Sequence, residues 1–203
     1  MVGVLINYEE RVMKDIREKD IIEIEFTEEL LEEWTKLWKK KHTRAKKNPI
    51  KKSSHPSINE WMILRRPIMN SLKQNWASFT EFVVDYYGLR DLGISHCNCK
   101  YIVYKDSRRR SDADNITPKM ILDGLSAEHG GVIVDDSSDC IEDLLLKIEY
   151  RKGIPGSKII FYNCEYDKEL LFKTKEKEQE KSRKREETNK ENKKAKKARK
   201  SGK

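Results

Sequence analysis

Apolar residues follow strand-like and helix-like periods in the first half of the chain. Over residues 20–26 apolar and acidic residues alternate, which is typical of a half-buried strand. Over residues 27–41 apolar residues recur at helical spacing, Thr27 can cap the helix, and the last turn is rich in lysine. A longer amphipathic stretch, residues 67–87, begins with Pro67, a residue favoured at the first helical position. These patterns predict one strand followed by two helices.

Shorter elements are predicted in the second half. The composition of residues 99–106 is typical of a strand. Thr117 and Pro118 form an N-cap and first-position pair, which predicts a short helix up to Ser126. Three further strands are predicted at residues 132–134, 144–151 and 158–164. The order of elements predicts a mixed α/β (α+β) fold, a single small domain in which helices pack on one mixed sheet.

The charged residues are unevenly distributed and define a tail. The chain has 203 residues, enough for about one domain. Residues 167–203 hold 16 Lys and Arg against 8 Asp and Glu, whereas residues 1–166 hold 27 of each. The tail has too few apolar residues to offset the entropy of ordering, so we expect it to be disordered or to form a solvated lone helix. We therefore expect an N-terminal segment at 1–19, a folded domain at 20–166 and this tail.

The sequence lacks the signals of a membrane protein or a secreted disulfide scaffold. No apolar run approaches the roughly 18 residues of a membrane span, and residues 1–10 do not resemble a signal peptide. We therefore expect a cytoplasmic protein with no membrane partner. His96, Cys97 and Cys99 suggest zinc, but no second Cys or His pair follows at zinc-finger spacing. We expect reduced thiols at Cys97, Cys99, Cys140 and Cys164.

Four carboxylates follow two of the predicted strands. Asp112 and Asp114 lie two residues apart, so in extended backbone both side chains project to the same side. Asp135 and Asp136 end the next apolar strand, and if the two strands are neighbours, the carboxylates converge at one sheet edge. Crowded carboxylates need a neutralising cation, and hard divalent ions choose oxygen ligands. The pattern favours metal-assisted hydrolysis of phosphate esters, with Mg²⁺ or Mn²⁺ as the ion.

Polar and basic side chains near these carboxylates complete the candidate site. Lys119 and Asp123 lie four residues apart on one face of the predicted short helix, where the lysine can hold a scissile phosphate or stabilise transition-state charge. Asn115 can orient a carboxylate or cap the turn. The residue types after Asp112 exclude an EF-hand loop. Three arginines directly upstream add positive charge for an approaching polyanion: Arg108, Arg109 and Arg110.

A second basic region lies between the two long predicted helices. Residues 36–52 contain nine Lys or Arg and no carboxylate, and apolar periodicity is missing as far as Pro56. We expect a basic, mobile surface that, with the three arginines, binds a nucleic-acid backbone in a salt-sensitive and nearly sequence-independent way. The candidate side chains in this region are Lys39, Lys40, Lys41, Arg44, Lys46, Lys47, Lys51 and Lys52.

In combination, these motifs resemble the RusA family of Holliday-junction resolvases, small endonucleases found in phages and prophages. The family pattern is Pro-Ser-x-Asn, Asp-x-Asp-Asn, a lysine, Asp-x-Leu and Asp-Asp-Ser, in that order. This chain has these motifs at residues 56–59, 112–115, 119, 123–125 and 135–137, within a match over about residues 56–163. The order and spacing of the set are far more specific than any one motif. Relative to the family, residues 27–55 contain an inserted helix and basic loop, and the tail is additional.

The resemblance implies a metal-dependent endodeoxyribonuclease that acts in DNA recombination and repair. Asp112, Asp114 and Asp136 would bind Mg²⁺, Lys119 would act close to the metal, and Asp135 would support the site. The family works as a homodimer that places two active sites on a four-way DNA junction and nicks two opposed strands. Two other functions remain open from the residues alone: a non-catalytic basic nucleic-acid-binding protein and a metal-stabilised structural module.

Overall fold

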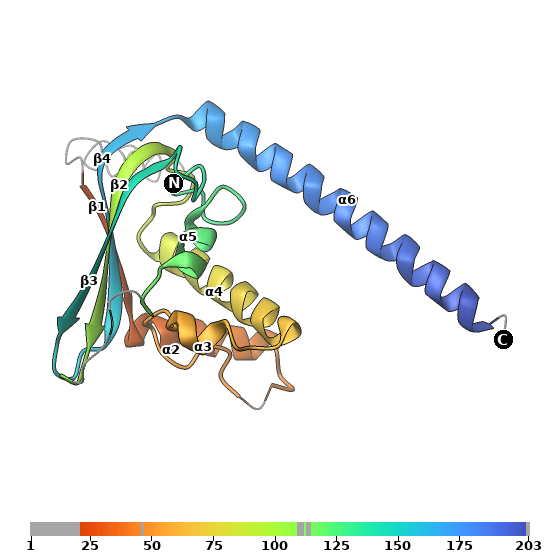
Figure 1. The fold of residues 1–203 in the computed structure, drawn as a ribbon, viewed down its shortest axis with the longest axis horizontal. Coiled ribbons are helices and arrows are strands. Elements are labelled where there is room, and N and C mark those ends of the chain that lie inside the picture. Colours follow the sequence, from red (N-terminus) through yellow and green to blue (C-terminus); the bar gives the residue numbers. More distant parts are fainter. Residues whose placement is uncertain (1–20, 46, 109–111, 113–114, 202–203) are drawn as a thin grey trace, which may run out of the picture.

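A computed structural model of the chain describes residues 21–45, 47–108, 112 and 115–201. A four-stranded sheet has the order β1-β4-β2-β3, and helices lie on one of its sides (Figure 1). The strands are β1 (Ile21–Thr27), β2 (Ile94–Lys105), β3 (Ile141–Tyr150) and β4 (Gly156–Tyr166). The helices are α2 (Glu28–Lys41), α3 (Ile58–Trp61), α4 (Arg66–Tyr86), α5 (Lys119–Leu125) and α6 (Lys168–Ser201).

The sheet is mixed, and the predicted α+β class is confirmed. β4 pairs antiparallel with both β1 and β2, whereas β2 and β3 run parallel. Parallel neighbours need a long crossover connection, which here consists of the loop after β2, α5 and the segment that leads into β3. The motifs predicted to form the site lie in this crossover.

Aromatic side chains fill the layer between the sheet and the helices. Phe26 on β1, Trp34 on α2 and Phe79 on α4 are buried, and the Phe79 ring centroid lies 5.9 Å from that of Phe26 and 5.5 Å from that of Trp34. Trp76 adds a third aromatic contact to Phe79 at 5.7 Å. Aromatic pairs at these separations add to the free energy of burial. The amphipathic stripes of both long helices therefore face the sheet, as their sequence period predicts.

Two predicted details of the crossover are wrong. Residues 132–134 do not form a strand: Ile133 makes only an isolated parallel bridge to Ile94. The reason is that the N–H groups of Val132 and Ile133 donate to the carbonyl of Leu125 at the end of α5, at 2.8 and 3.1 Å, and not to a strand. Thr117 is not the N-cap of α5, because Pro118 occupies that position.

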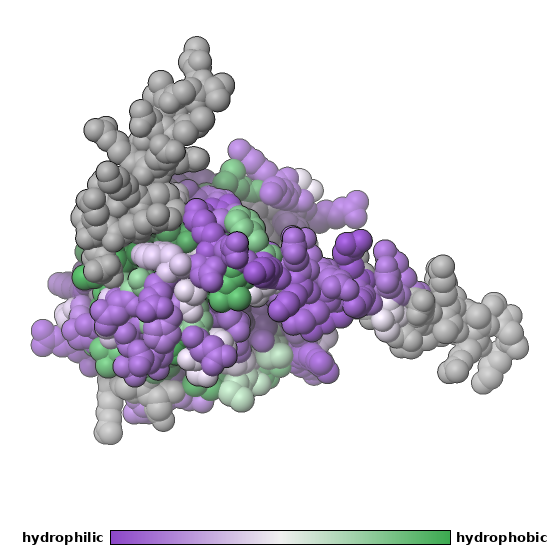
Figure 2. Space-filling view, turned by 90° about the horizontal axis from the view of Figure 1, so that it is seen from above, coloured by the Kyte–Doolittle hydropathy of each residue, from purple (hydrophilic) through white to green (hydrophobic). Residues whose placement is uncertain are grey.

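The tail begins with an anchored turn and continues as a long helix. α6 buries Leu171 completely against Ala127 and Val134, and Lys175 forms an ion pair with Asp91. Beyond this contact α6 extends away from the domain (Figure 1), and the part of it that is coloured in Figure 2 is mostly hydrophilic. The expectation that the whole tail is solvated is therefore wrong for its first turns, where Leu171 supplies an apolar contact.

The basic region between α2 and α4 is also anchored. Ile50 is buried in the core, and Ser53 is buried with its N–H and hydroxyl both donating to Glu28 Oε1 at 2.9 Å. The expectation of a mobile surface is wrong at these two residues, because Ser53 binds Glu28 of α2 and Ile50 packs in the core. The four cysteines form no disulfide: Cys97, Cys99 and Cys140 are buried and Cys164 is half-buried. None of the helices within the described ranges is long and apolar enough to span a membrane.

Candidate active site

Close packing of α5 on α4 fixes the position of the helix that carries Lys119. The buried face of α5 includes Gly124, and a Cβ at this position would lie 2.6 Å from Cβ of Thr80 on α4. Only glycine lets the two helices approach this closely. The glycine of the Asp-x-Leu motif thus has a structural role: it sets the distance between α5 and the core.

His55 holds the start of α5. Its Nε2 accepts a hydrogen bond from the Met120 backbone N–H at 3.0 Å, and its Nδ1 donates to the Pro56 carbonyl at 2.7 Å. This pattern requires a neutral ring with its proton on Nδ1. Burial lowers the pKa of His55 to about 4, outweighing the bond to Pro56 and the charge of Glu60. His55 therefore satisfies one of the free N–H groups of the helix start.

Lys119 joins two carboxylates from separate segments. Its Nζ lies 3.0 Å from Asp123 Oδ1, one turn along α5, and 3.2 Å from Asp136 Oδ2 in the segment before β3. The Asp136 N–H in turn donates to Asp135 Oδ1 at 2.9 Å, which fixes the turn that presents Asp136. Four residues of the predicted site are thus brought together by α5 and the 134–140 segment.

The charges of this cluster shift one another. Partial burial alone would lower the pKa of Lys119, but the hydrogen bond and charge of Asp123, together with Asp136, raise it. Burial raises the pKa of Asp123, and the like charge of Asp136 adds to this effect while Lys119 opposes it. The cluster therefore keeps Lys119 positively charged between two carboxylates. Burial makes the charged form of one of them, Asp123, less favourable.

The 134–140 segment is held at both of its ends by the first residues of β2. The Ile94 carbonyl accepts from the Val134 N–H at 2.8 Å and from the Cys140 thiol at 3.3 Å. The Cys97 N–H donates to the Cys140 carbonyl at 2.8 Å. Asp136 therefore lies on a short segment with fixed ends.

The predicted meeting of strand ends does not occur. Asp136 follows a bridge to Ile94 at the start of β2, whereas Asp112 lies in the loop that follows the other end of β2. Asp112 is exposed, and its carbonyl accepts from the Asn115 N–H at 3.3 Å. Asp114 lies outside the described residues. Within the described part of the chain, no three His, Cys, Asp or Glu side chains are grouped to hold a metal ion.

A different contact brings the loop after β2 to the helices. Asn59 Nδ2 on α3 donates to Asn115 Oδ1 at 2.8 Å, across 56 residues of sequence. The helix that carries Asn59 is capped by Glu60, whose carboxylate accepts from the Ser57 N–H at 2.8 Å. The Pro-Ser-x-Asn and Asp-x-Asp-Asn segments are therefore in contact, although periodicity gave no reason to expect it.

Nothing among protein-family models, curated proteins and solved structures matches this chain.

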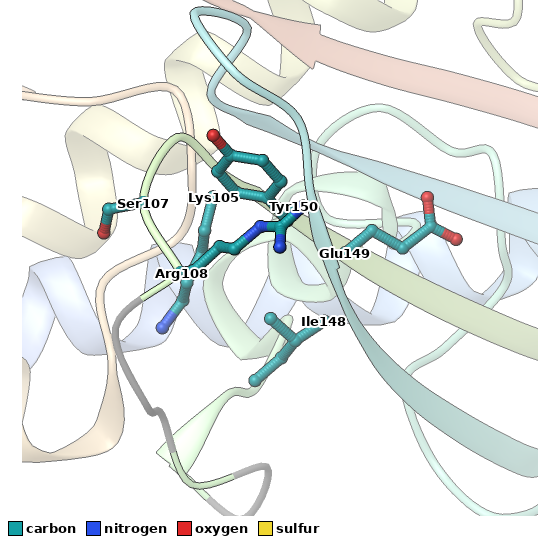
Figure 3. A pocket seen from close by; sticks show the side chains of 6 residues that line it. All are labelled: Lys105, Ser107, Arg108, Ile148, Glu149 and Tyr150. Carbon is teal, nitrogen blue, oxygen red and sulfur yellow. The ribbon is translucent and has the colours of Figure 1, made fainter.

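The basic candidates occupy two places. The lysines at the end of α2 and in the following loop are exposed: Lys39, Lys40, Lys41, Arg44, Lys47, Lys51 and Lys52. Arg108 lies at the far end of β2, its guanidinium carbon 5.0 Å from the Tyr150 ring centroid, beside an open pocket of about 500 Å³ (Figure 3). Lys46, Arg109 and Arg110 lie outside the described residues.

The sequence did not reveal the roles of two residues that support the site, His55 and Asn59. His55 is a single histidine in a polar loop, with no period or spacing that marks it as a helix anchor. Asn59 was recognised only as part of a motif, and its partner Asn115 is too distant in sequence for spacing to reveal. The adjacent Pro56 is the one local signal, because it fixes the backbone where the His55 ring makes its bond.

Proposed function

We propose that this chain is a metal-dependent, structure-selective endodeoxyribonuclease that resolves four-way DNA junctions by paired nicks. One observation carries the proposal: Lys119 joins Asp123 and Asp136, from two segments of the chain, at 3.0 and 3.2 Å. These are the residues at which the sequence resembles the RusA resolvases. The Asn59–Asn115 contact adds support, since it joins two further motifs of the same set.

Lys119 is suited to hold the scissile phosphate. Its ammonium is nearly half exposed, at 45%, and so remains accessible while two carboxylates keep it charged. A fixed cation beside the reacting phosphate stabilises the charge that develops there in the transition state. Asp123 acts as the positioning residue for Lys119, because it lies one turn along the same helix and is itself half-buried.

The donor set suits a hard divalent ion. Asp112, Asp114 and Asp136 offer carboxylate oxygens, the ligand type that Mg²⁺ and Mn²⁺ prefer. When bound, such an ion would supply Lewis-acid polarisation of the phosphate and a more acidic water. Because Asp136 is fixed by the turn with Asp135, this chain presents at least one such carboxylate in a defined position.

Junction cleavage by paired nicks needs two active sites. We propose a homodimer, because a two-fold symmetric enzyme places equivalent sites on a two-fold branched substrate. The exposed lysines of α2 and the following loop, with Arg108, are the proposed contacts to the DNA arms. Such contacts neutralise phosphates and give salt-dependent affinity with little sequence preference.

A non-catalytic nucleic-acid-binding protein is the second candidate. The charge distribution of α6 favours it: residues 181–203 hold 12 Lys or Arg against 3 Asp or Glu, whereas residues 168–180 hold 4 of each. A basic arm of this kind binds phosphates without any need for chemistry.

Incubation of the purified chain with a synthetic four-way junction in Mg²⁺ or Mn²⁺ distinguishes the two candidates. We expect paired nicks near the branch point, and their loss in Lys119→Met. Retardation of the junction without cutting in either metal would favour the non-catalytic binder and contradict the nuclease.

A further inference from the structure

The turn between α3 and α4 exposes apolar side chains beside the candidate active site. Met62 and Ile63 are 65% and 82% exposed, and Ile68 on the first turn of α4 is 55% exposed. The preceding Trp61 is partly buried against the core and anchors the turn. This turn directly continues α3, since the Met62 N–H donates to the Ile58 carbonyl at 3.0 Å, and Asn59 of α3 is bonded to Asn115. The apolar tip therefore follows the helix that contacts the loop after β2.

The surroundings of this tip are positive. Residues 61–80 include no Asp or Glu and three basic residues, Arg65, Arg66 and Lys73. Arg65 is the N-cap of α4 and Arg66 its first residue, and both are exposed. Cations at a helix N-terminus are unfavourable, because they add to the positive end of the helix dipole. A bound polyanion would relieve this cost, whereas an ordinary solvated turn would not.

We infer that Met62 and Ile63 form a wedge that enters the branch point of the DNA substrate, while Arg65 and Arg66 hold the flanking phosphates. Apolar side chains that insert between base steps are a known means of opening or kinking DNA, and unstacked bases at a branch point offer a ready place for them. The charge of the turn selects DNA over a second copy of the chain as the occupant, since two such surfaces would repel each other. This inference rests on the proposed junction specificity and assigns it to a particular turn.

The test measures binding separately from cleavage. Two probes are used in EDTA: a four-way junction with 2-aminopurine at the branch point, and a linear duplex of the same length. We expect the wild-type chain to prefer the junction and to raise the 2-aminopurine fluorescence as its base is unstacked. In the double variant Met62→Ser/Ile63→Ser the junction preference should fall about tenfold and the fluorescence change should disappear, while affinity for linear duplex stays within about twofold. The double variant Arg65→Gln/Arg66→Gln should weaken binding to the junction and to the linear duplex by the same factor.

Ile154→Ser provides the matched control, because Ile154 is 63% exposed in the β3–β4 turn. It should leave both measurements unchanged. An unaltered junction preference in the Met62/Ile63 variant would overturn the wedge. Conversion of a dimer to a monomer by this variant would also overturn it, because the surface would then be a contact with a second copy of the chain. Cleavage in Mg²⁺ is scored in parallel: a variant-sensitive junction preference without any cleavage by wild type would refute the nuclease proposal and leave the wedge standing.

Discussion

Asn59 donates a hydrogen bond to Asn115 at 2.8 Å, joining α3 to the loop that follows β2. Asn115 directly follows Asp114, and Lys119 begins α5 four residues later. The contact and the start of α5 therefore fix residues 115 to 119, which directly follow the candidate metal ligands. A fixed segment beside the ligands favours a defined geometry of the reacting groups.

Loss of this contact should affect activity more than stability. In Asn59→Ala we expect junction cleavage to fall on the order of 10- to 100-fold, because a small displacement of the reacting groups is costly. The free energy of unfolding should fall by about 1 kcal/mol or less, since the bond is exposed. Asn70→Ala, which removes an exposed amide from α4, serves as the control and should change neither quantity. Equal cleavage by both variants would refute a role for the contact.

The chain should lose stability between neutral pH and pH 4 because of His55. An unfolded histidine has a pKa near 6.5, whereas burial lowers the pKa of His55 to about 4. Between these values the unfolded chain takes up a proton that the folded chain does not, so lowering the pH destabilises the fold by up to roughly 3 kcal/mol, and no further change comes from this group below pH 4. Urea unfolding at a series of pH values measures the effect.

His55→Gln is the comparison for this prediction, since it cannot titrate. The variant should be less stable at neutral pH, yet the stability difference between wild type and variant should shrink as the pH falls from 6.5 to 4. A difference that stays constant over this range would show that His55 does not hold the neutral form described above.

Gly124→Ala tests whether close helix packing positions Lys119. Helix propensity alone predicts that alanine stabilises α5 by about 1 kcal/mol. Because the new Cβ would lie 2.6 Å from Thr80 Cβ, we instead expect a destabilisation of about 1–3 kcal/mol and reduced cleavage. Thermal unfolding measures the first effect. Ser71→Ala, an exposed position on α4, is the control and should be neutral or slightly stabilising; the same outcome at Gly124 would contradict the packing argument.

The distal half of α6 should contribute charge but not stability. Removal of residues 181–203 deletes 12 basic residues and keeps Leu171 and Lys175, which dock the helix on the domain. We expect weaker DNA binding, with the slope of log affinity against log salt reduced by about 0.9 for each lost phosphate contact. The thermal midpoint should not change. An unaltered salt slope would mean that the arm does not contact DNA.

Leu171→Ala is the complementary variant. It leaves the charge of α6 unchanged but removes a fully buried side chain from the contact with Ala127 and Val134. We expect a loss of about 2–3 kcal/mol in stability and no change in the salt slope.

Strong periodicity explains which elements could be predicted from the sequence. β1, α2 and α4 were predicted to within about a residue at each end, because their apolar residues repeat on one face. β2 begins five residues earlier than predicted, since Ile94, Cys97 and Asn98 are all buried and show no alternation. The four-residue α3 is too short to produce a helical period.

The parts of the site that were missed depend on tertiary contacts. Asp136 was expected to meet Asp112 through adjacent strand ends, but the backbone of residues 132–133 bonds to α5 and Ile133 pairs with the start of β2. Lys119, predicted from helical spacing with Asp123, does reach Asp136. Local spacing was thus sufficient within α5, whereas the approach of distant segments was not readable from the sequence.

Junction cleavage by Asp136→Asn tests the central claim most directly. The substitution keeps the size of the side chain and removes the charge that pairs with Lys119 at 3.2 Å. Asp139→Asn, an exposed carboxylate in the same segment, is the matched control. We predict that Asp136→Asn cuts a four-way junction at least about 100-fold more slowly in Mg²⁺ while binding it equally well or more tightly, and that Asp139→Asn cuts normally. Normal cleavage by Asp136→Asn would contradict an active site built on this carboxylate and Lys119.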